Sequence, residues 1–126
     1  MIADKKTGKI IAPAFCEGKK ADFALFKHSR TCFACTSVCL GDSGYQGLDK
    51  YHKNSHTPKK KSKRHPLTDG DKADNRAISR QRIGCEHVIG RLKVFKILSE
   101  RYRNRRKRFG LRFNLLAAIC NLERDE

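Results

Sequence analysis

The sequence has no apolar run of the roughly 18 residues needed to cross a membrane, and its N-terminus lacks the apolar core of a signal peptide. It also has no internal repeat and no low-complexity tail. These absences predict a cytoplasmic protein with no membrane contact. At 126 residues the chain is long enough for one small domain with a modest core.

Acidic residues are scarce, with 13 Asp and Glu against 29 Lys and Arg, giving a net charge of +16. The excess is uneven, because residues 1–57 carry 9 basic and 5 acidic side chains, net +4, whereas residues 58–126 carry 20 and 8, net +12. Such a balance indicates a polyanionic partner, most simply nucleic acid, bound mainly by the second half of the chain.

Six cysteines in a chain without a secretion signal favour free thiols over disulfides. Cys32, Cys35 and Cys39 follow His28 in a zinc-like half-site, but no downstream CxxC or HxxxH supplies the other ligands of a structural site, so no zinc is expected. Instead we expect Cys32 and Cys35 to pack as small apolar residues at a helix end, and Cys39 to lie in a buried strand. The same interpretation applies to Cys16, Cys85 and Cys120.

Two stretches concentrate the positive charge. The first basic segment, residues 56–66, contains two prolines that disfavour a helix, so it is expected to be extended. A solvated charge run is the alternative, but the net charge favours phosphate contact. The second basic segment, residues 101–108, holds six cations around Tyr102, whose ring is suited to stacking on a base. The candidate DNA-binding residues are Lys59, Lys60, Lys61, Lys63, Arg64, Lys93, Arg101, Arg103, Arg105 and Arg106.

The N-terminal part of the chain predicts an α/β arrangement. Residues 1–16 read as a hairpin that turns at residues 6–8, with a second strand over residues 9–15. Asp22 is expected to cap a helix that fades between residues 29 and 32. Residues 36–40 are uncharged and β-branched, which suits a buried strand. A short amphipathic piece is expected over residues 48–52.

Asp42 follows that strand directly, among the glycines of the run GDSGYQG. A carboxylate at the carboxyl end of a strand, followed by a tight turn, is a common way to present an acid in a cleft. The alternative is an ordinary turn residue, since Asp-Ser-Gly is good turn chemistry.

A long basic helix dominates the second half. Thr68 and Asp71 form a capping-box pattern at its start, and its end is expected near Ser99 or Glu100. An apolar stripe at offsets of three and four residues should face a core; its members are Cys85, Val88, Leu92 and Phe95. A final helix over residues 111–122 should close over the core through Leu115, Leu116, Ile119 and Leu122.

Arg82, Glu86 and Lys93 lie on a neighbouring face of the long helix, at offsets of four and seven residues. Glu86 is the only acid between Asp74 and Glu100. It is either a surface ion-pair partner of Arg82 or an essential group.

These motifs occur in a characteristic order: GKKADFALFKHS, GDSGYQGL, HTPKKK, LTDGDKADNRAISRQRIGCEHVIGRLKVFKILSERYRNRR and FGLRFNLLAAICNLE. Across almost the whole chain they resemble the DDE-superfamily transposases (endonucleases) of bacterial insertion sequences. The resemblance implies an RNase H-like fold, DNA as substrate at the element's ends and target, and two divalent ions, Mg²⁺ or Mn²⁺, held by three carboxylates. Asp42 matches the second of these acids and Glu86 the third, with Arg82 and Lys93 in support.

Two departures from the family pattern qualify this reading. Ser79 stands where a related signature, Tyr-x2-Arg-x3-Glu-x6-Lys, has tyrosine. The first acid belongs on a central strand upstream of the hairpin, and no residue here matches it, since Asp4 falls in the hairpin itself. The chain therefore reads as residues 1–126 of a partial RNase H-like catalytic domain that lacks its first central strand.

Such a partial domain is expected to be inactive alone, as the product of a truncated, split or decayed gene, and to be nucleoid-associated. Its partners besides DNA would be the missing N-terminal half or a full-length transposase. The alternative is a small basic, non-enzymatic nucleic-acid-binding protein, or a regulator of a full-length transposase.

Overall fold

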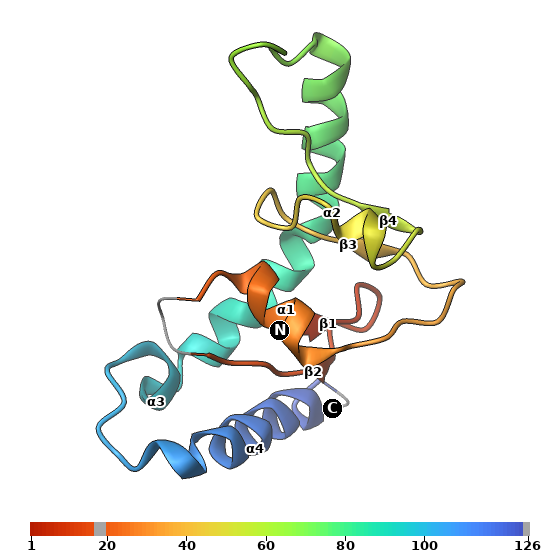
Figure 1. The fold of residues 1–126 in the computed structure, drawn as a ribbon. Coiled ribbons are helices and arrows are strands. Elements are labelled where there is room, and N and C mark those ends of the chain that lie inside the picture. Colours follow the sequence, from red (N-terminus) through yellow and green to blue (C-terminus); the bar gives the residue numbers. More distant parts are fainter. Residues whose placement is uncertain (17–19, 125–126) are drawn as a thin grey trace. The chain divides into compact units, whose positions relative to one another are not determined.

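The computed structural model describes residues 1–16 and 20–124 and has an α/β composition of short strands and helices (Figure 1). The chain divides into two compact units. The terminal unit combines Met1–Phe15 with Ile83–Glu126, and the middle unit is Cys16–Arg82. Helix α2, Asp69–Lys93, is continuous and contributes to both units (Figure 1). Among the described residues, no helix is long and apolar enough to cross a membrane.

The terminal unit begins with the expected hairpin. Strand β1, Ile2–Ala3, pairs antiparallel with β2, Ile10–Ala12. The turn is closed by hydrogen bonds from Gly8 N–H to the Asp4 carbonyl and from Asp4 N–H to the Lys9 carbonyl, both 2.8 Å, and Gly8 adopts a φ of 65° that favours glycine. The second strand ends at Ala12 rather than at residue 15, because Pro13 has no N–H to donate to a ladder.

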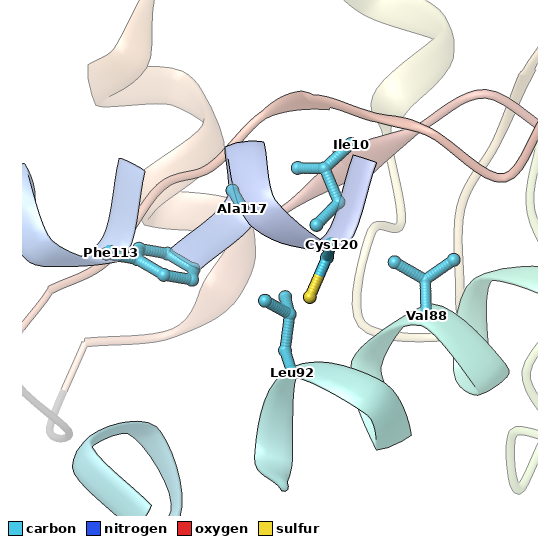
Figure 2. Packing of buried hydrophobic residues seen from close by; sticks show 6 residues of the cluster. All are labelled: Ile10, Val88, Leu92, Phe113, Ala117 and Cys120. Atoms are coloured by element: carbon cyan, nitrogen blue, oxygen red, sulfur yellow. The ribbon is translucent and has the colours of Figure 1, made fainter. Parts of the chain in front are cut away.

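The core of the terminal unit lies between α2, β2 and α4, Phe109–Leu122. In Figure 2, Leu92 and Val88 of α2 point towards Cys120 of α4, with Ile10 of β2 beside them. Val88 and Leu92 are buried, while Cys85 and Phe95 are half-buried, so the predicted apolar stripe of α2 is confirmed. The buried set is Ile10, Val88, Leu92, Phe113, Ala117 and Cys120.

Helix α4 forms where expected, but the predicted core face was wrong. Leu115, Ile119 and Leu122 are 61%, 37% and 68% exposed, and Leu116 is half-buried. The core is instead contacted by Phe113, Ala117 and Cys120, on the opposite side of the helix. Because α4 is apolar on all sides, periodicity alone does not select a face. The small side chains at 117 and 120 permit a close approach to Leu92.

Helix α2 ends earlier than predicted. It stops at Lys93, and a separate short helix, α3, covers Lys96–Ser99. The break is a tight turn in which Val94 N–H bonds to the Arg91 carbonyl and Phe95 N–H to the Leu92 carbonyl, both at 3.2 Å. This turn brings Phe95 and Leu98 against the same core, so burial of apolar surface offsets the lost helical bonds.

Asn121 of α4 ties the hairpin to this core. Its side-chain amide accepts a hydrogen bond from Ile10 N–H at 2.7 Å and donates one to the Ile10 carbonyl at 2.9 Å. The amide thus pairs both backbone groups of a buried strand residue, which would otherwise lose their hydrogen bonds on leaving water.

The middle unit contains α1, Asp22–Ser29, β3, Cys39–Leu40, a 3-10 turn η1, Leu48–Lys50, and β4, Ser55–His56. Strand β3 pairs in parallel with β4, with Cys39 opposite Ser55 and Leu40 opposite His56. Leu48 is 2% exposed, which confirms the amphipathic piece at residues 48–52. Beyond β4 the first basic segment is irregular to residue 66, as predicted.

The predicted buried strand over residues 36–40 was too long. Only Cys39 and Leu40 are extended in a ladder, and both are half-buried. Ser37 N–H bonds to the Ala34 carbonyl in a turn, and Val38 is 60% exposed. The partner strand β4 offers only two residues for pairing, so the uncharged run before Cys39 has nothing to pair with.

Two smaller expectations for this unit also fail. Helix α1 begins as predicted, but Ala21 occupies the capping position without a side-chain bond, and Asp22 is an acid of the first turn. Cys32 and Cys35 lie beyond the helix and are exposed, so they do not pack as apolar residues. The expectation holds for Cys120, which is buried and whose thiol pKa is raised by desolvation. All six cysteines are free.

Candidate metal and DNA site

Asp42 follows β3 directly, at the carboxyl end of the strand. Gly41 N–H bonds to the His56 carbonyl at 2.9 Å and completes the β3–β4 ladder. One residue later, the Asp42 Oδ1 atom accepts a hydrogen bond from Gly44 N–H at 2.6 Å, and the Asp42 carbonyl accepts one from Tyr45 N–H at 3.0 Å. Asp42 is therefore both the turn residue and the strand-end acid that the sequence offered as alternatives. The turn fixes the Oδ1 atom through the Gly44 hydrogen bond, while the Oδ2 atom takes no part in the turn.

Glycine is required at position 44 for this arrangement. A Cβ atom there would lie 2.9 Å from the Asp42 Oδ1 atom, which is too close for carbon and oxygen. Any larger residue would displace the carboxylate. The glycine thus helps to determine how Asp42 is presented.

Arg82 faces this carboxylate. Its Nη2 atom lies 3.8 Å from the Asp42 Oδ2 atom, and the two side chains are 24% and 41% exposed. The sequence offered an i,i+4 pair of Arg82 with Glu86 as one alternative, but in the structure Arg82 pairs with Asp42. The tertiary fold of the middle unit, rather than the helix register, selects its partner.

Glu86 lies one turn further along α2, in the terminal unit, where its side chain is exposed. It borders a shallow hollow on the helix surface with His87, Gly90 and Arg91. Lys93 is the last residue of α2 and is also exposed. Asp42 and Glu86 therefore belong to different units. Over residues 1–16 and 20–124, the structure contains no cluster of three side chains suited to hold a metal ion.

The donor chemistry of the two acids nevertheless fits a hard divalent cation. Carboxylate oxygens are the ligands that Mg²⁺ prefers. Among the residues that the structure describes, the Asp42 Oδ2 atom accepts no hydrogen bond and has one charged neighbour, Arg82 at 3.8 Å. Glu86 has no ion-pair partner within the described part of the chain. Each acid thus has an oxygen available for a cation.

The first basic segment is fixed to the start of α2 by Lys59. Its backbone N–H and carbonyl bond to the Asn75 side chain at 2.8 and 3.0 Å, and its ammonium group lies 2.5 Å from an Asp71 oxygen. Thr68 and Asp71 form the predicted reciprocal capping box, with both bonds at 3.1 Å. The hydrogen bond from Lys59, followed by those from Thr68, lowers the pKa of Asp71 to about 2.

This arrangement divides the cations of the segment into two kinds. The charge of Lys59 is matched by Asp71, and the hydrogen bond to that acid raises the pKa of Lys59. Exposed cations without a carboxylate partner among the described residues follow it, and these are Lys60, Lys61, Lys63 and Arg64. Lys59 anchors the segment, and the others extend into solvent.

The cations of the second basic segment are exposed as well, and those that the sequence singled out are Arg101, Arg103, Arg105 and Arg106. Tyr102, in contrast, is half-buried and packs edge-on against Phe109, with ring centroids 4.8 Å apart. Its hydroxyl also accepts a hydrogen bond from Arg112 at 2.5 Å. Sequence reasoning missed both of these contacts, because no local spacing connects Tyr102 with Arg112.

Comparison with known proteins identifies the class. The family model described as "DDE superfamily endonuclease" matches residues 2–121, and the chain therefore belongs to this family of insertion-sequence transposases. Endonucleases of this superfamily depend on divalent metal ions and act on DNA. The family that the order of motifs indicated is thus confirmed.

A curated relative gives the comparison more detail. The chain is 47% identical over 123 residues to the "Probable transposase for insertion sequence element IS702" of Microchaete diplosiphon. The match covers 98% of this chain and 45% of that protein, so the chain spans less than half of the relative's length. No solved structure matches.

Proposed function

We propose that this chain carries two of the three metal-binding acids of a DDE transposase, Asp42 and Glu86, on residues 1–126 of an RNase H-like catalytic domain. The observation that carries the proposal is the position of Asp42. It lies two residues beyond the end of β3, a strand of a parallel pair, and its carboxylate is fixed by a tight turn. This is how α/β folds present groups at the carboxyl ends of strands. Membership of the family adds Glu86, because the match spans both residues.

Mg²⁺ or Mn²⁺ would be held between the carboxylates of Asp42 and Glu86 and a third acid. Such ions would supply activation of the attacking oxygen and stabilisation of the leaving oxygen of a phosphodiester. No third carboxylate of the described residues completes the set. We therefore propose that the chain alone does not cleave DNA.

The chain's own residues have three supporting roles in this proposal. Arg82 holds the Oδ2 atom of Asp42 in place until a cation takes over that charge. Lys93, at the end of α2, binds a phosphate near Glu86. The exposed cations of the two basic segments hold the DNA backbone by charge, which predicts binding that weakens steeply with salt.

A reconstituted cleavage assay tests the metal assignment. The chain is combined with a polypeptide covering the part of the curated relative that this chain does not match, and with DNA carrying the element's ends. Nicking is measured with Mg²⁺ and with Mn²⁺. Asp42→Asn and Glu86→Gln each keep the shape of the side chain but remove its charge, and each should abolish nicking while DNA binding remains.

Asp49→Asn is the matched control, because Asp49 is an exposed acid on η1 outside the proposed site. It should nick DNA at the rate of the unmodified chain. Nicking that survives both Asp42→Asn and Glu86→Gln would show that these acids are not the metal ligands. Tight DNA binding by the chain alone, with no nicking in any combination, would favour a regulator of a full-length transposase.

A further inference from the structure

Tyr102 joins the second basic segment to the first turn of α4. Arg112 Nη1 donates a hydrogen bond to the Tyr102 hydroxyl at 2.5 Å, and that hydroxyl donates to the Arg105 carbonyl at 3.4 Å. The guanidinium carbon of Arg112 lies 5.8 Å from the centroid of the Tyr102 ring. The Tyr102 ring also packs against the ring of Phe109, which in turn packs against the core of the terminal unit. Three successive contacts thus fix the loop between residues 102 and 112.

Arg112 itself is half-buried and lacks a balancing charge. No carboxylate of the described residues lies within ion-pair distance of it. Glu123, the next acid along the sequence, is paired with Arg91 at 3.1 Å. A guanidinium has five N–H donors, and among residues 1–16 and 20–124 one hydrogen bond, to the Tyr102 hydroxyl, uses them. A partly buried charge with no partner is costly, and the cost falls when an anion with several acceptor oxygens binds.

The surroundings favour a phosphate as that anion. From residue 101 to residue 122 the sequence has no Asp or Glu. The exposed cations of residues 101–108 therefore have no acidic neighbour within this stretch of the sequence. Helix α4 also has no acid in its first turn and no side-chain cap. The summed field is strongly positive, and within it the Arg112 guanidinium is held in place by its hydrogen bond to the Tyr102 hydroxyl.

We propose that Arg112, held by Tyr102, is a fixed binding site for a DNA backbone phosphate in the second basic segment, and that Tyr102 is a positioning residue rather than a stacking platform. The inference rests on the DNA binding of the proposed function. It adds Arg112, which the sequence did not assign to DNA binding, and it gives Tyr102 a role other than base stacking. Arg112 supplies a planar fork matched to two phosphate oxygens.

The test measures DNA binding of the full chain by fluorescence anisotropy on a labelled duplex of mixed sequence, across a series of salt concentrations. Arg112→Gln removes one phosphate contact. It should weaken binding roughly fivefold to tenfold near 0.1 M salt and reduce the slope of log K against log salt by about one. Tyr102→Phe keeps the ring and every cation. It should weaken binding roughly twofold to fivefold with the slope unchanged, because the loop must then be ordered on binding.

Lys53→Gln is the matched control for the loss of one charge, since Lys53 is exposed in the middle unit and outside both basic segments. Its affinity should stay within about twofold of the unmodified chain. Arg112→Lys keeps the positive charge, so it distinguishes the loss of a charge contact from a general folding defect caused by changing residue 112. It should restore the salt slope while the affinity stays below that of the unmodified chain. Circular dichroism of each variant reports on folding.

Several outcomes would overturn the inference. If Arg112→Gln behaves like Lys53→Gln while the unmodified chain binds DNA, Arg112 is no phosphate site, although the proposed function stands. If Tyr102→Phe binds as tightly as the unmodified chain, Tyr102 has no positioning role. If the unmodified chain does not bind DNA at all, the proposed function and this inference fail together.

A last experiment distinguishes a DNA backbone phosphate from free inorganic phosphate as the ligand of Arg112. Inorganic phosphate replaces chloride at matched ionic strength, and displacement of the duplex is compared. Equal displacement by the two salts supports the DNA backbone as the ligand. Displacement by phosphate that exceeds displacement by chloride, and that disappears in Arg112→Gln, would identify a site for free phosphate and contradict the assignment to DNA.

Discussion

The Arg82 guanidinium faces the Asp42 carboxylate, with Nη2 and Oδ2 3.8 Å apart. One helical turn separates Arg82 from Glu86, the acid to which helix spacing had assigned it. A cation beside a candidate metal ligand orients its carboxylate when no metal is bound. The same cation would have to share that oxygen with an incoming Mg²⁺, so in the proposed site Arg82 would be a positioning residue.

This pair should contribute little to stability. Replacing Arg82 with Gln is expected to lower the free energy of unfolding by less than about 1 kcal/mol, because the pair is long and partly exposed. The same change should weaken metal-dependent nicking in the reconstituted assay. Urea unfolding and the nicking rate are measured on the same preparation. A loss of stability well above that value would make Arg82 chiefly a structural residue.

Asp71 gives the fold a pH dependence at low pH. Its pKa in the folded chain is lowered to about 2 from its ordinary value of 3.8 by Lys59 and Thr68. The unfolded state therefore binds more protons than the folded state in this range. The contribution of Asp71 to the free energy of unfolding is complete above about pH 4 and is lost as the pH falls towards 2.

Thermal unfolding midpoints measured from pH 5 to pH 2 test this effect. Asp71→Asn should flatten part of the decline, whereas Asp49→Asn should not. The remaining decline has a contribution from Asp4, whose pKa is also lowered, chiefly by a hydrogen bond from Lys6 N–H. An Asp71→Asn profile parallel to that of the unmodified chain would contradict the role assigned to the Lys59 contact.

The two faces of the terminal unit's helices should differ sharply in their sensitivity to truncation. Leu92→Ala removes a side chain that is 5% exposed in the core and should cost about 2–5 kcal/mol. Leu115→Ala makes the same chemical change on α4 at a side chain that is 61% exposed, and should cost less than about 0.5 kcal/mol. Denaturant unfolding of both variants measures the difference. Similar costs would mean that the exposed face of α4 is covered in solution.

The Asn121 side chain should contribute measurably to the free energy of unfolding, although it is polar. Asn121→Ala leaves the N–H and carbonyl groups of the buried Ile10 without partners, which should cost about 1–3 kcal/mol. Asn114→Ala is the matched control, since Asn114 is exposed on the same helix. Its effect should be small, and hydrogen exchange of the Ile10 amide should speed up only in the Asn121 variant. Unchanged exchange in that variant would contradict the proposed role of the amide.

Local chemistry accounts for much of what the sequence predicted correctly. The hairpin turn, the start of α1, the capping box at Thr68 and the stripe through Val88 and Leu92 all depend on residues within four positions of one another. Their backbone preferences and side-chain spacing act over one or two turns, so they can be read without a fold. The order of the motifs also identified the family.

The failures occur where a partner distant in the sequence decides the outcome. The strand predicted over residues 36–40 was too long. The length of the real strand depends on its partner β4, which supplies only two residues for pairing. Helix α2 stops at Lys93 because a turn there lets Phe95 reach the core, and no breaker residue marks that position. Cys32 and Cys35 are exposed since nothing packs over them.

By itself, the sequence determined the family, the two basic segments and most helix starts, and it singled out Asp42 and Glu86 as candidate metal-binding acids. These are properties of composition, order and short-range spacing. Only the tertiary structure decided which face of α4 is buried and that Arg82 contacts Asp42. It also decided that Lys59 pairs with Asp71 and that Arg112 donates a hydrogen bond to Tyr102. An apolar surface or a charged group has many possible partners along a chain, and close packing in three dimensions selects among them.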